Sequence, residues 1–158
     1  MNGWNKIALA AAGCGAIVYA YARRLGRMKA NLVVTPAVSV YSLSLTGLVL
    51  RADVLIKNPS NTSFRMKFPF VTLFYKDVLL GSSNVVDQDI PINAYGEAVI
   101  QKIMIEIPLS SVFSMVTTLL NSIQNKQQVK ITTKITTVVD LGWTKTNYED
   151  TQEIILRN

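Results

Sequence analysis

The stretch LVLRADVLIKNPS, residues 48–60, carries the clearest strand pattern in this chain of 158 residues. Its side chains alternate between an apolar face and a mostly charged face. The apolar face consists of Leu50, Ala52, Val54 and Ile56, and the other face consists of Arg51, Asp53, Leu55 and Lys57. Asn58 and Pro59 end the strand, because proline has no N–H to donate to a neighbouring strand and asparagine favours turns. The alternation predicts a β-strand with one face in a hydrophobic core.

The same period of two residues recurs on both sides of this strand. Residues 38–45 alternate with mixed faces, and residues 64–68 place Phe64, Met66 and Phe68 opposite Arg65 and Lys67. Pro69 then predicts a bulge or an edge position. Two later strands have longer inward faces, which we predict to be Val99, Ile103, Ile105 and Ile107 in one and Val129, Ile131, Thr133, Ile135 and Thr137 in the other. Turn residues separate these strands at 76–77, at Pro91 and Gly96, and between Gly142 and Asn147.

One segment has a helical period instead of a strand period. Its apolar residues recur at helical spacing and are Val112, Val116, Leu119, Leu120 and Ile123. Ser110 or Ser111 can cap the start of this helix. About seven strands, frequent turns and one amphipathic helix predict an all-β fold, an antiparallel β-sandwich, over residues 30–158.

The order of motifs in VLIKNPSNTSFRMKFPFVTLFYKDVLLGSS, residues 54–83, resembles the type 2 late embryogenesis abundant (LEA) proteins, whose domain is called WHy, for water stress and hypersensitive response. The match continues through residues 90–120 and covers roughly residues 38–156. Its motif residues are Asn58, Pro59 and Gly81. The resemblance implies an immunoglobulin- or fibronectin III-like sandwich without enzymatic activity, often tethered by an N-terminal signal or membrane segment. The Thr-rich strand ITTKITTVV, residues 131–139, and the lack of an acidic surface depart from the family.

The N-terminal stretch IALAAAGCGAIVYAYARR, residues 7–24, opens with sixteen uncharged residues. As a helix these sixteen span about 24 Å, and the helix reaches across a bilayer if it extends from Trp4 to Leu25 with its flanking cations directed to the headgroups. The short motif AAAGC, which ends at Cys14, also fits a lipoprotein signal, but the apolar run continues past the cysteine where a lipidated protein would begin a polar tether. We therefore favour a single-pass membrane helix in residues 1–29.

A third interpretation of this stretch is a helix that packs on protein. Small residues recur every four positions, at Ala8, Ala12, Ala16 and Ala20. Such rows let helices approach closely, inside a bilayer or inside a protein assembly, and permit oligomers through the N-terminal helix. If the helix spans a membrane, its basic flank predicts that the β domain lies on the cytoplasmic side; this flank is Arg23, Arg24, Arg27 and Lys29.

The distribution of charge and the rare residue types exclude several classes of function. Residues 1–29 hold five Lys and Arg and no acid, whereas the remainder is nearly neutral, with eleven Lys and Arg against ten Asp and Glu. A nucleic-acid-binding domain would carry its positive excess on its own folded surface, so we expect no nucleic-acid partner. With no histidine and one cysteine, the chain cannot form a Ser-His or Cys-His nucleophile pair or a Cys/His zinc site.

Weak site patterns remain, and none predicts a catalytic, metal or cofactor site or a small-molecule substrate. Asp87 and Asp89 could offer oxygens to a cation, but solvated loop acids explain them more simply. Asn61, Thr62 and Ser63 form a glycosylation sequon, which matters only in a secretory lumen. We therefore expect a non-enzymatic, membrane-tethered binding or protective module with lipid or protein partners. The alternative is a structural subunit of a virion or an envelope assembly, anchored through its N-terminal helix.

Overall fold

A computed structural model describes residues 23, 31–44, 47–108 and 113–156. The chain divides into two units, residues 1–32 and 33–158, of which the second is the β domain. The proposed membrane helix and the alanine row Ala8, Ala12, Ala16 and Ala20 lie outside the described residues, as do Arg24, Arg27 and Lys29, whereas Arg23 is helical and exposed. Among the residues that the structure describes, no helix has the length and apolar character that crossing a bilayer requires.

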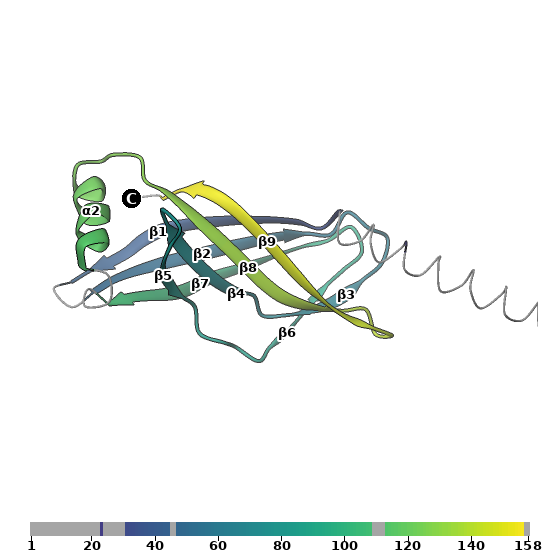
Figure 1. Cartoon of the computed structure of the whole chain (residues 1–158). Helices are drawn as coiled ribbons and strands as arrows, with labels where there is room; N and C mark the ends of the chain where they lie inside the picture. The colour runs from purple at the N-terminus through teal and green to yellow at the C-terminus, as the bar shows by residue number, and fades with distance from the viewer. Residues whose placement is uncertain (1–22, 24–30, 45–46, 109–112, 157–158) are drawn as a thin grey trace, which may run out of the picture. The chain divides into compact units, whose positions relative to one another are not determined.

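The β domain contains two antiparallel sheets that face one another (Figure 1). The first sheet has the order β1-β2-β7, with the bounds β1 Val33–Leu43, β2 Gly47–Lys57 and β7 Glu97–Pro108. The second sheet has six strands, namely β3 Phe64–Lys67, β4 Phe70–Tyr75, β5 Val78–Ser82, β6 Asp89–Ile92, β8 Lys130–Asp140 and β9 Lys145–Ile155. The prediction of an all-β sandwich is confirmed.

The second sheet centres on β8, which pairs with β9 on one side and with both β3 and β4 on the other. The break between β3 and β4 falls at Phe68 and Pro69, where the sequence predicted a bulge or edge. Thr137 bridges this break, because its hydroxyl donates to the Lys67 carbonyl oxygen at 2.6 Å. The break and the short β6 within the predicted loop at Pro91 raise the strand number above the expected seven, to nine among the described residues.

The inward faces of β2 and β8, where the sequence alternates most regularly, form the core. The apolar side of β2, from Leu50 to Ile56, is fully buried. The inward side of β8 is Ile131, Thr133, Ile135 and Thr137, all buried, and Val129, which precedes β8, is buried as well. On the outer side of β2, Arg51 forms a 2.9 Å ion pair with Asp53. These faces agree with the sequence because neither strand contains an interruption on its buried side.

The inward position predicted for Val99 in β7 is wrong, since its side chain is 54% exposed and Ile100 points inward instead. A bulge after Ile100 causes the exchange: the pairing with β2 shifts register between Ala52 and Val54, and Lys102 has a φ of 61°. One inserted residue moves the side chains on either side of it to opposite faces. Ile103, Ile105 and Ile107 follow the bulge and are buried as predicted.

The single helix of the β domain among the described residues is α2, Phe113–Gln124, as the helical spacing predicted. Leu119 is fully buried, and Leu120 and Ile123 are half-buried. The helix ends in a Schellman arrangement, in which Gln127 N donates to Ser122 O at 2.9 Å and Lys126, with a φ of 53°, donates to Ile123 O. The caps proposed at Ser110 and Ser111, and Val112, lie outside the described residues.

Candidate binding site

Asn58, the first residue of the Asn-Pro motif, is buried to 3% exposure immediately after β2. Its side-chain Nδ2 donates to the carbonyl oxygens of Thr62, at 2.9 Å, and Asn93, at 2.8 Å. Its Oδ1 accepts from the backbone N–H and the hydroxyl of Ser60, at 3.1 and 2.6 Å. Every hydrogen-bonding position of this amide therefore serves the protein, and the motif builds a loop.

Backbone bonds join the loop of residues 58–63 to the loop of residues 93–96. Asn58 N donates to Gly96 O, and Tyr95 N donates to Ser60 O, both at 2.9 Å. The Ser63 hydroxyl oxygen accepts from Ala94 N at 3.0 Å. Pro59 is exposed in the first of these loops, where its lack of an N–H costs no hydrogen bond. The two loops thus form one hydrogen-bonded body at this end of the sandwich.

Gly81, the third motif residue, lies far from these loops in β5. A Cβ atom added there would stand 3.1 Å from the carbonyl oxygen of Glu106 and 3.3 Å from Cγ2 of Ile105 in β7. A larger residue would push β5 away from β7 along this side of the sandwich. The structure therefore separates the motif residues: Asn58 and Pro59 shape a loop, and Gly81 permits close packing.

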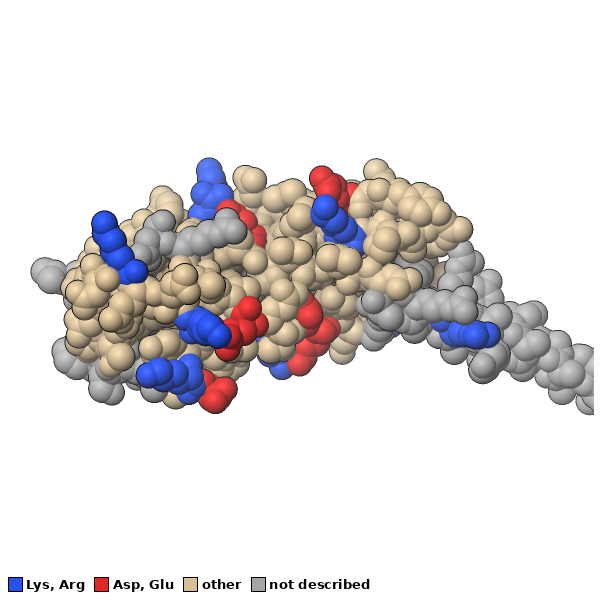
Figure 2. Space-filling view, turned by 90° about the horizontal axis from the view of Figure 1, so that it is seen from above, with Lys and Arg blue, Asp and Glu red and all other residues tan. Residues whose placement is uncertain are grey.

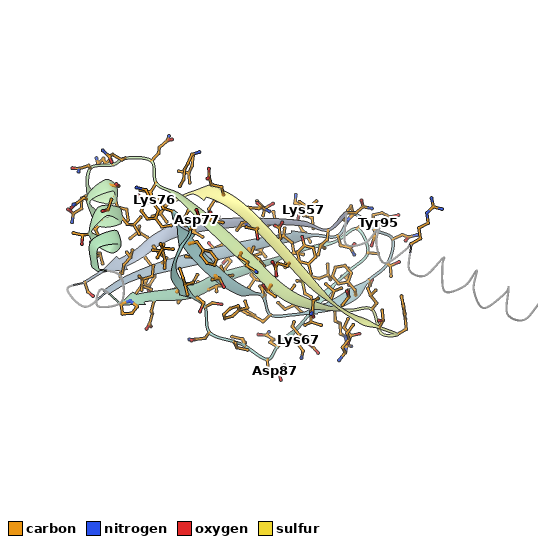
Figure 3. The ribbon with its side chains drawn as sticks, in the orientation of Figure 1. Lys57, Lys67, Lys76, Asp77, Asp87 and Tyr95 are labelled. Atoms are coloured by element: carbon orange, nitrogen blue, oxygen red, sulfur yellow. The ribbon has the colours of Figure 1, made fainter. Side chains whose placement is uncertain are left out.

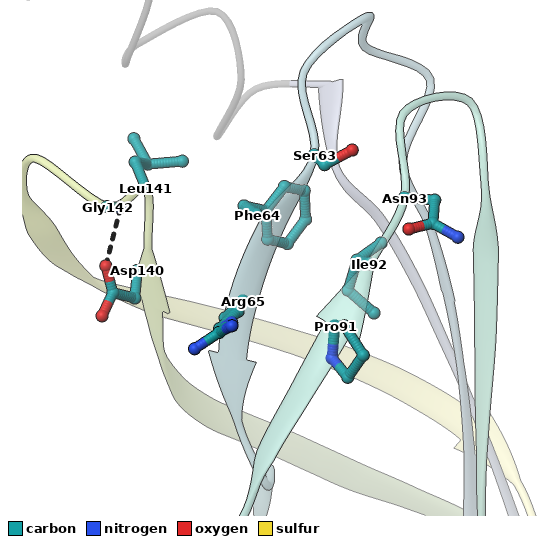
Figure 4. A pocket seen from close by; sticks show the side chains of 9 residues that line it. All are labelled: Ser63, Phe64, Arg65, Pro91, Ile92, Asn93, Asp140, Leu141 and Gly142. Carbon is teal, nitrogen blue, oxygen red and sulfur yellow. Dashed lines mark hydrogen bonds between the residues drawn. The ribbon is translucent and has the colours of Figure 1, made fainter.

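A groove of about 360 Å³ opens beside the loop of residues 58–63, between β3 and β6 on one side and the β8–β9 turn on the other (Figure 4). It is lined by Ser63, Phe64, Arg65, Pro91, Ile92, Asn93, Asp140, Leu141 and Gly142. Pairing of Arg65 with Asp140 brings the turn to this position. The wall combines apolar surface with one guanidinium and one carboxylate, as in sites that hold a ligand by a few polar contacts.

Two polar side chains of the groove, Asp140 and Ser63, are engaged within the protein. Gly142 N donates to Asp140 Oδ1 at 2.8 Å (Figure 4), and Lys145 Nζ lies 3.5 Å from the other carboxylate oxygen. The Gly142 hydrogen bond and then the charge of Lys145 hold the pKa of Asp140 below its ordinary value. Gly142 adopts a φ of 86°, which glycine reaches without the steric cost of a side chain. The Ser63 hydroxyl oxygen likewise accepts a hydrogen bond, from Ala94 N.

The acid pair Asp87 and Asp89 faces a cation from the protein itself. Lys67 Nζ lies 2.7 Å from Asp87 Oδ1, and both residues are labelled in Figure 3. The same Nζ lies 2.9 Å from Asp89 Oδ1. These hydrogen bonds, first that of Asp87 and then that of Asp89, raise the pKa of Lys67 to about 12, and the same lysine lowers the pKa of Asp87. Lys67 therefore supplies a positive charge to both acids from within the protein. The described residues contain no cluster of three or more metal-ligating side chains.

Two exposed aromatic residues near the groove were not singled out from the sequence. Tyr95 is 74% exposed in the loop of residues 93–96, and Trp143 is 55% exposed in the β8–β9 turn. Tyr95 has a φ of 53°, a conformation that costs a residue with a side chain on the order of 1 kcal/mol. The signal was present in the motif NAYG, where an aromatic occupies a turn position that favours asparagine or glycine.

Several charges elsewhere on the domain form pairs of opposite sign. Lys130 and Lys134 of β8 lie 2.8 Å from Glu153 and Glu149 of β9, respectively. On the face seen in Figure 2, Lys and Arg side chains are interspersed with Asp and Glu. This face therefore presents no field of a single sign.

Comparisons with known proteins agree with the architecture. No family model and no curated protein matches the sequence. Among solved structures, a crystal structure of a protein from Archaeoglobus fulgidus superposes with a TM-score of 0.52 at 10% identity, over 81% of this chain and 98% of that chain. The likeness establishes the fold alone.

Two solution structures are less similar. An Arabidopsis thaliana protein has a TM-score of 0.43 at 15% identity, over 77% of this chain and 78% of its own. A candidate late embryogenesis abundant protein has a TM-score of 0.36 at 15% identity, over 98% and 87%.

Proposed function

We propose that this chain is a non-enzymatic binding or protective module of the WHy type, which residues 1–29 tether to a membrane. The observation that carries the proposal is the complete engagement of Asn58: the motif that the sequence shares with this family is used to join two loops beside an open groove. Because the motif side chain is used to shape the loop, we expect a partner to contact the surface beside it, where the groove lies.

The groove supports binding over catalysis. Its hydroxyl, from Ser63, accepts a backbone hydrogen bond, and its carboxylate, from Asp140, is held ionised by Gly142 and Lys145. A general base needs a pKa near the working pH, and a depressed carboxyl pKa is unsuited to that task. We expect a lipid or protein partner, and no nucleic acid, because the positive excess of the chain is confined to residues 1–29.

The tether rests on the sixteen uncharged residues from Ile7 to Ala22 and the four cations that follow them. This asymmetry favours a single pass with the β domain on the cytoplasmic side. The alanine row favours the second candidate, a structural subunit of a virion or envelope assembly whose helix packs on other proteins.

Native mass measurement after extraction in mild detergent distinguishes the two candidates. A tethered module is expected to leave the membrane as a particle built from this chain alone, with a mass of 17.5 kDa or a small multiple of it. Co-extraction with other proteins at a fixed stoichiometry would favour the structural subunit and contradict the proposal.

A further inference from the structure

The chain enters the β domain at the end that carries the Asn58 loop. Val33, the first residue of β1, pairs with Lys57, and Lys57 pairs with Glu97 at the start of β7. The loop of residues 58–63 follows Lys57, and the loop of residues 93–96 precedes Glu97. The β8–β9 turn lies on the other side of the groove from these loops. We call the loops 58–63 and 93–96 and the turn 141–144 the Asn58 end. In the sequence, three residues, 30–32, separate residues 1–29 from the first residue of β1.

Both exposed aromatic residues noted above belong to the Asn58 end. Figure 3 shows Tyr95 at this end. Tyrosine and tryptophan have an apolar ring with a polar edge and are enriched where a membrane meets water. The Tyr95 side chain is 74% exposed although its backbone is fixed by the hydrogen bond to Ser60. An aromatic kept outward in a left-handed conformation is better explained by a contact with a partner than by folding.

The charges of the Asn58 end favour an anionic surface. The two acids that border it, Glu97 and Asp140, each have a cation beside them, since Glu97 lies 3.6 Å from Lys57 and Asp140 lies 3.5 Å from Lys145. Arg65, exposed in the groove, forms no ion pair with any residue that the structure describes, and so leaves one surplus cation. The acids Asp87 and Asp89 pair with Lys67 at the other end of β3. Anionic headgroups would therefore meet a net positive surface here.

From these observations we propose that the Asn58 end docks on the lipid surface, with Tyr95 and Trp143 in the headgroup region and Arg65 facing anionic headgroups. This inference rests on the proposed tether, because the chain passes from residues 1–29 into the β domain at Val33, which pairs with Lys57 beside the Asn58 end. It assigns a lipid-binding role to residues that the family motif does not include.

Fluorescence quenching by brominated lipids tests the docking in the full chain. The chain has two tryptophans, so Trp4→Phe leaves Trp143 as the reporter. The protein is reconstituted into vesicles of phosphatidylcholine and phosphatidylglycerol, with or without bromine on the acyl chains close to the headgroups. Docking predicts that the brominated vesicles quench the fluorescence of Trp143 relative to vesicles without bromine.

A matched control places the reporter elsewhere on the domain. Tyr41 is 61% exposed and lies near the other end of β1. In a chain with Trp4→Phe, Trp143→Phe and Tyr41→Trp, docking predicts that the brominated vesicles do not quench the reporter. When the reporter is Tyr95→Trp instead of Tyr41→Trp, docking predicts quenching like that of Trp143.

Flotation of the same vesicles keeps the two proposals distinct. A protein that floats with the vesicles while its Trp143 emission is the same with and without bromine overturns the docking and leaves the tether standing. Equal quenching at positions 41 and 143 also overturns the docking, because the contact would have no preferred end. A protein that does not float overturns both the tether and the docking that depends on it.

Discussion

The Asn58 side chain donates to the carbonyl oxygen of Asn93 at 2.8 Å, across 35 residues of sequence. This bond connects the loop that follows β2 with the loop that follows β6, and so connects the two sheets at one end of the sandwich. The Asn-Pro motif is therefore explained by one buried amide that completes the hydrogen bonding of two loops.

Asn58→Ala is expected to lower the free energy of unfolding by about 2–3 kcal/mol, because it removes the four hydrogen bonds of a buried amide. The matched control is Asn61→Ala, three residues on, where the side chain is exposed and bonds only to the neighbouring Thr62 hydroxyl; its cost should be within about 0.5 kcal/mol. Urea denaturation measures both. Equal losses would show that the two loops do not depend on Asn58.

Replacing two threonines of β8 should change the free energy of unfolding in opposite directions. The Thr133 hydroxyl is buried without a hydrogen-bond partner, whereas the Thr137 hydroxyl donates to Lys67 O at 2.6 Å. Thr133→Val should raise the free energy of unfolding by about 1 kcal/mol, and Thr137→Val should lower it by about 1–2 kcal/mol. Thermal denaturation of both variants measures the signs, and a loss of stability in Thr133→Val would mean that its hydroxyl has a partner in solution.

The stability of the domain should depend on pH through Asp53 in β2. Burial alone would raise the pKa of Asp53, but hydrogen bonds from Arg51 and from the Lys102 N–H at the bulge, aided by the charges of both residues, lower it below 3.8. A lowered folded-state pKa means that the contribution is complete above pH 3.8 and is lost as the pH falls through the folded-state value. The stability difference between wild type and Asp53→Asn should therefore shrink below this pH, while Asp87 and Asp140 titrate equally in both. Parallel pH curves would contradict this role.

A chain that begins at Lys29 should be soluble and should unfold cooperatively, because residues 33–158 form a compact unit with their own core. Circular dichroism on heating, with size-exclusion chromatography, measures both properties. Aggregation of every truncation near this position would place the N-terminal helix in the core and argue against a tether.

The residue pattern was sufficient where a strand runs without interruption. In β2 and β8 every second side chain is buried, as predicted, because the period of a strand is fixed by its backbone. In β7 the period alone could not locate the bulge at Lys102, whose conformation is held by Asp53 from a strand 49 residues away. The prediction for Val99 failed for that reason.

The candidate site was less visible because it is assembled from distant segments. Asn58 and Pro59 were noticed as a motif, but the amide's partner Asn93 and the exposed Tyr95 belong to what the sequence indicated only as a loop. Arg65 and Asp140 come together only through the pairing of β3 with β8. The residues adjacent in sequence to each of these positions do not indicate which distant segment it will contact.

Flotation of the full chain with liposomes tests the membrane tether most directly. Leu9→Arg combined with Ile17→Arg should abolish flotation, since each cation at mid-bilayer costs about 2.5–3.5 kcal/mol, whereas Cys14→Ser should leave flotation nearly unchanged, because one hydroxyl can bond back within a helix. Loss of flotation in Cys14→Ser would instead indicate a lipid attached at the cysteine. Flotation that persists in the double arginine variant would contradict the tether and place residues 1–29 against protein.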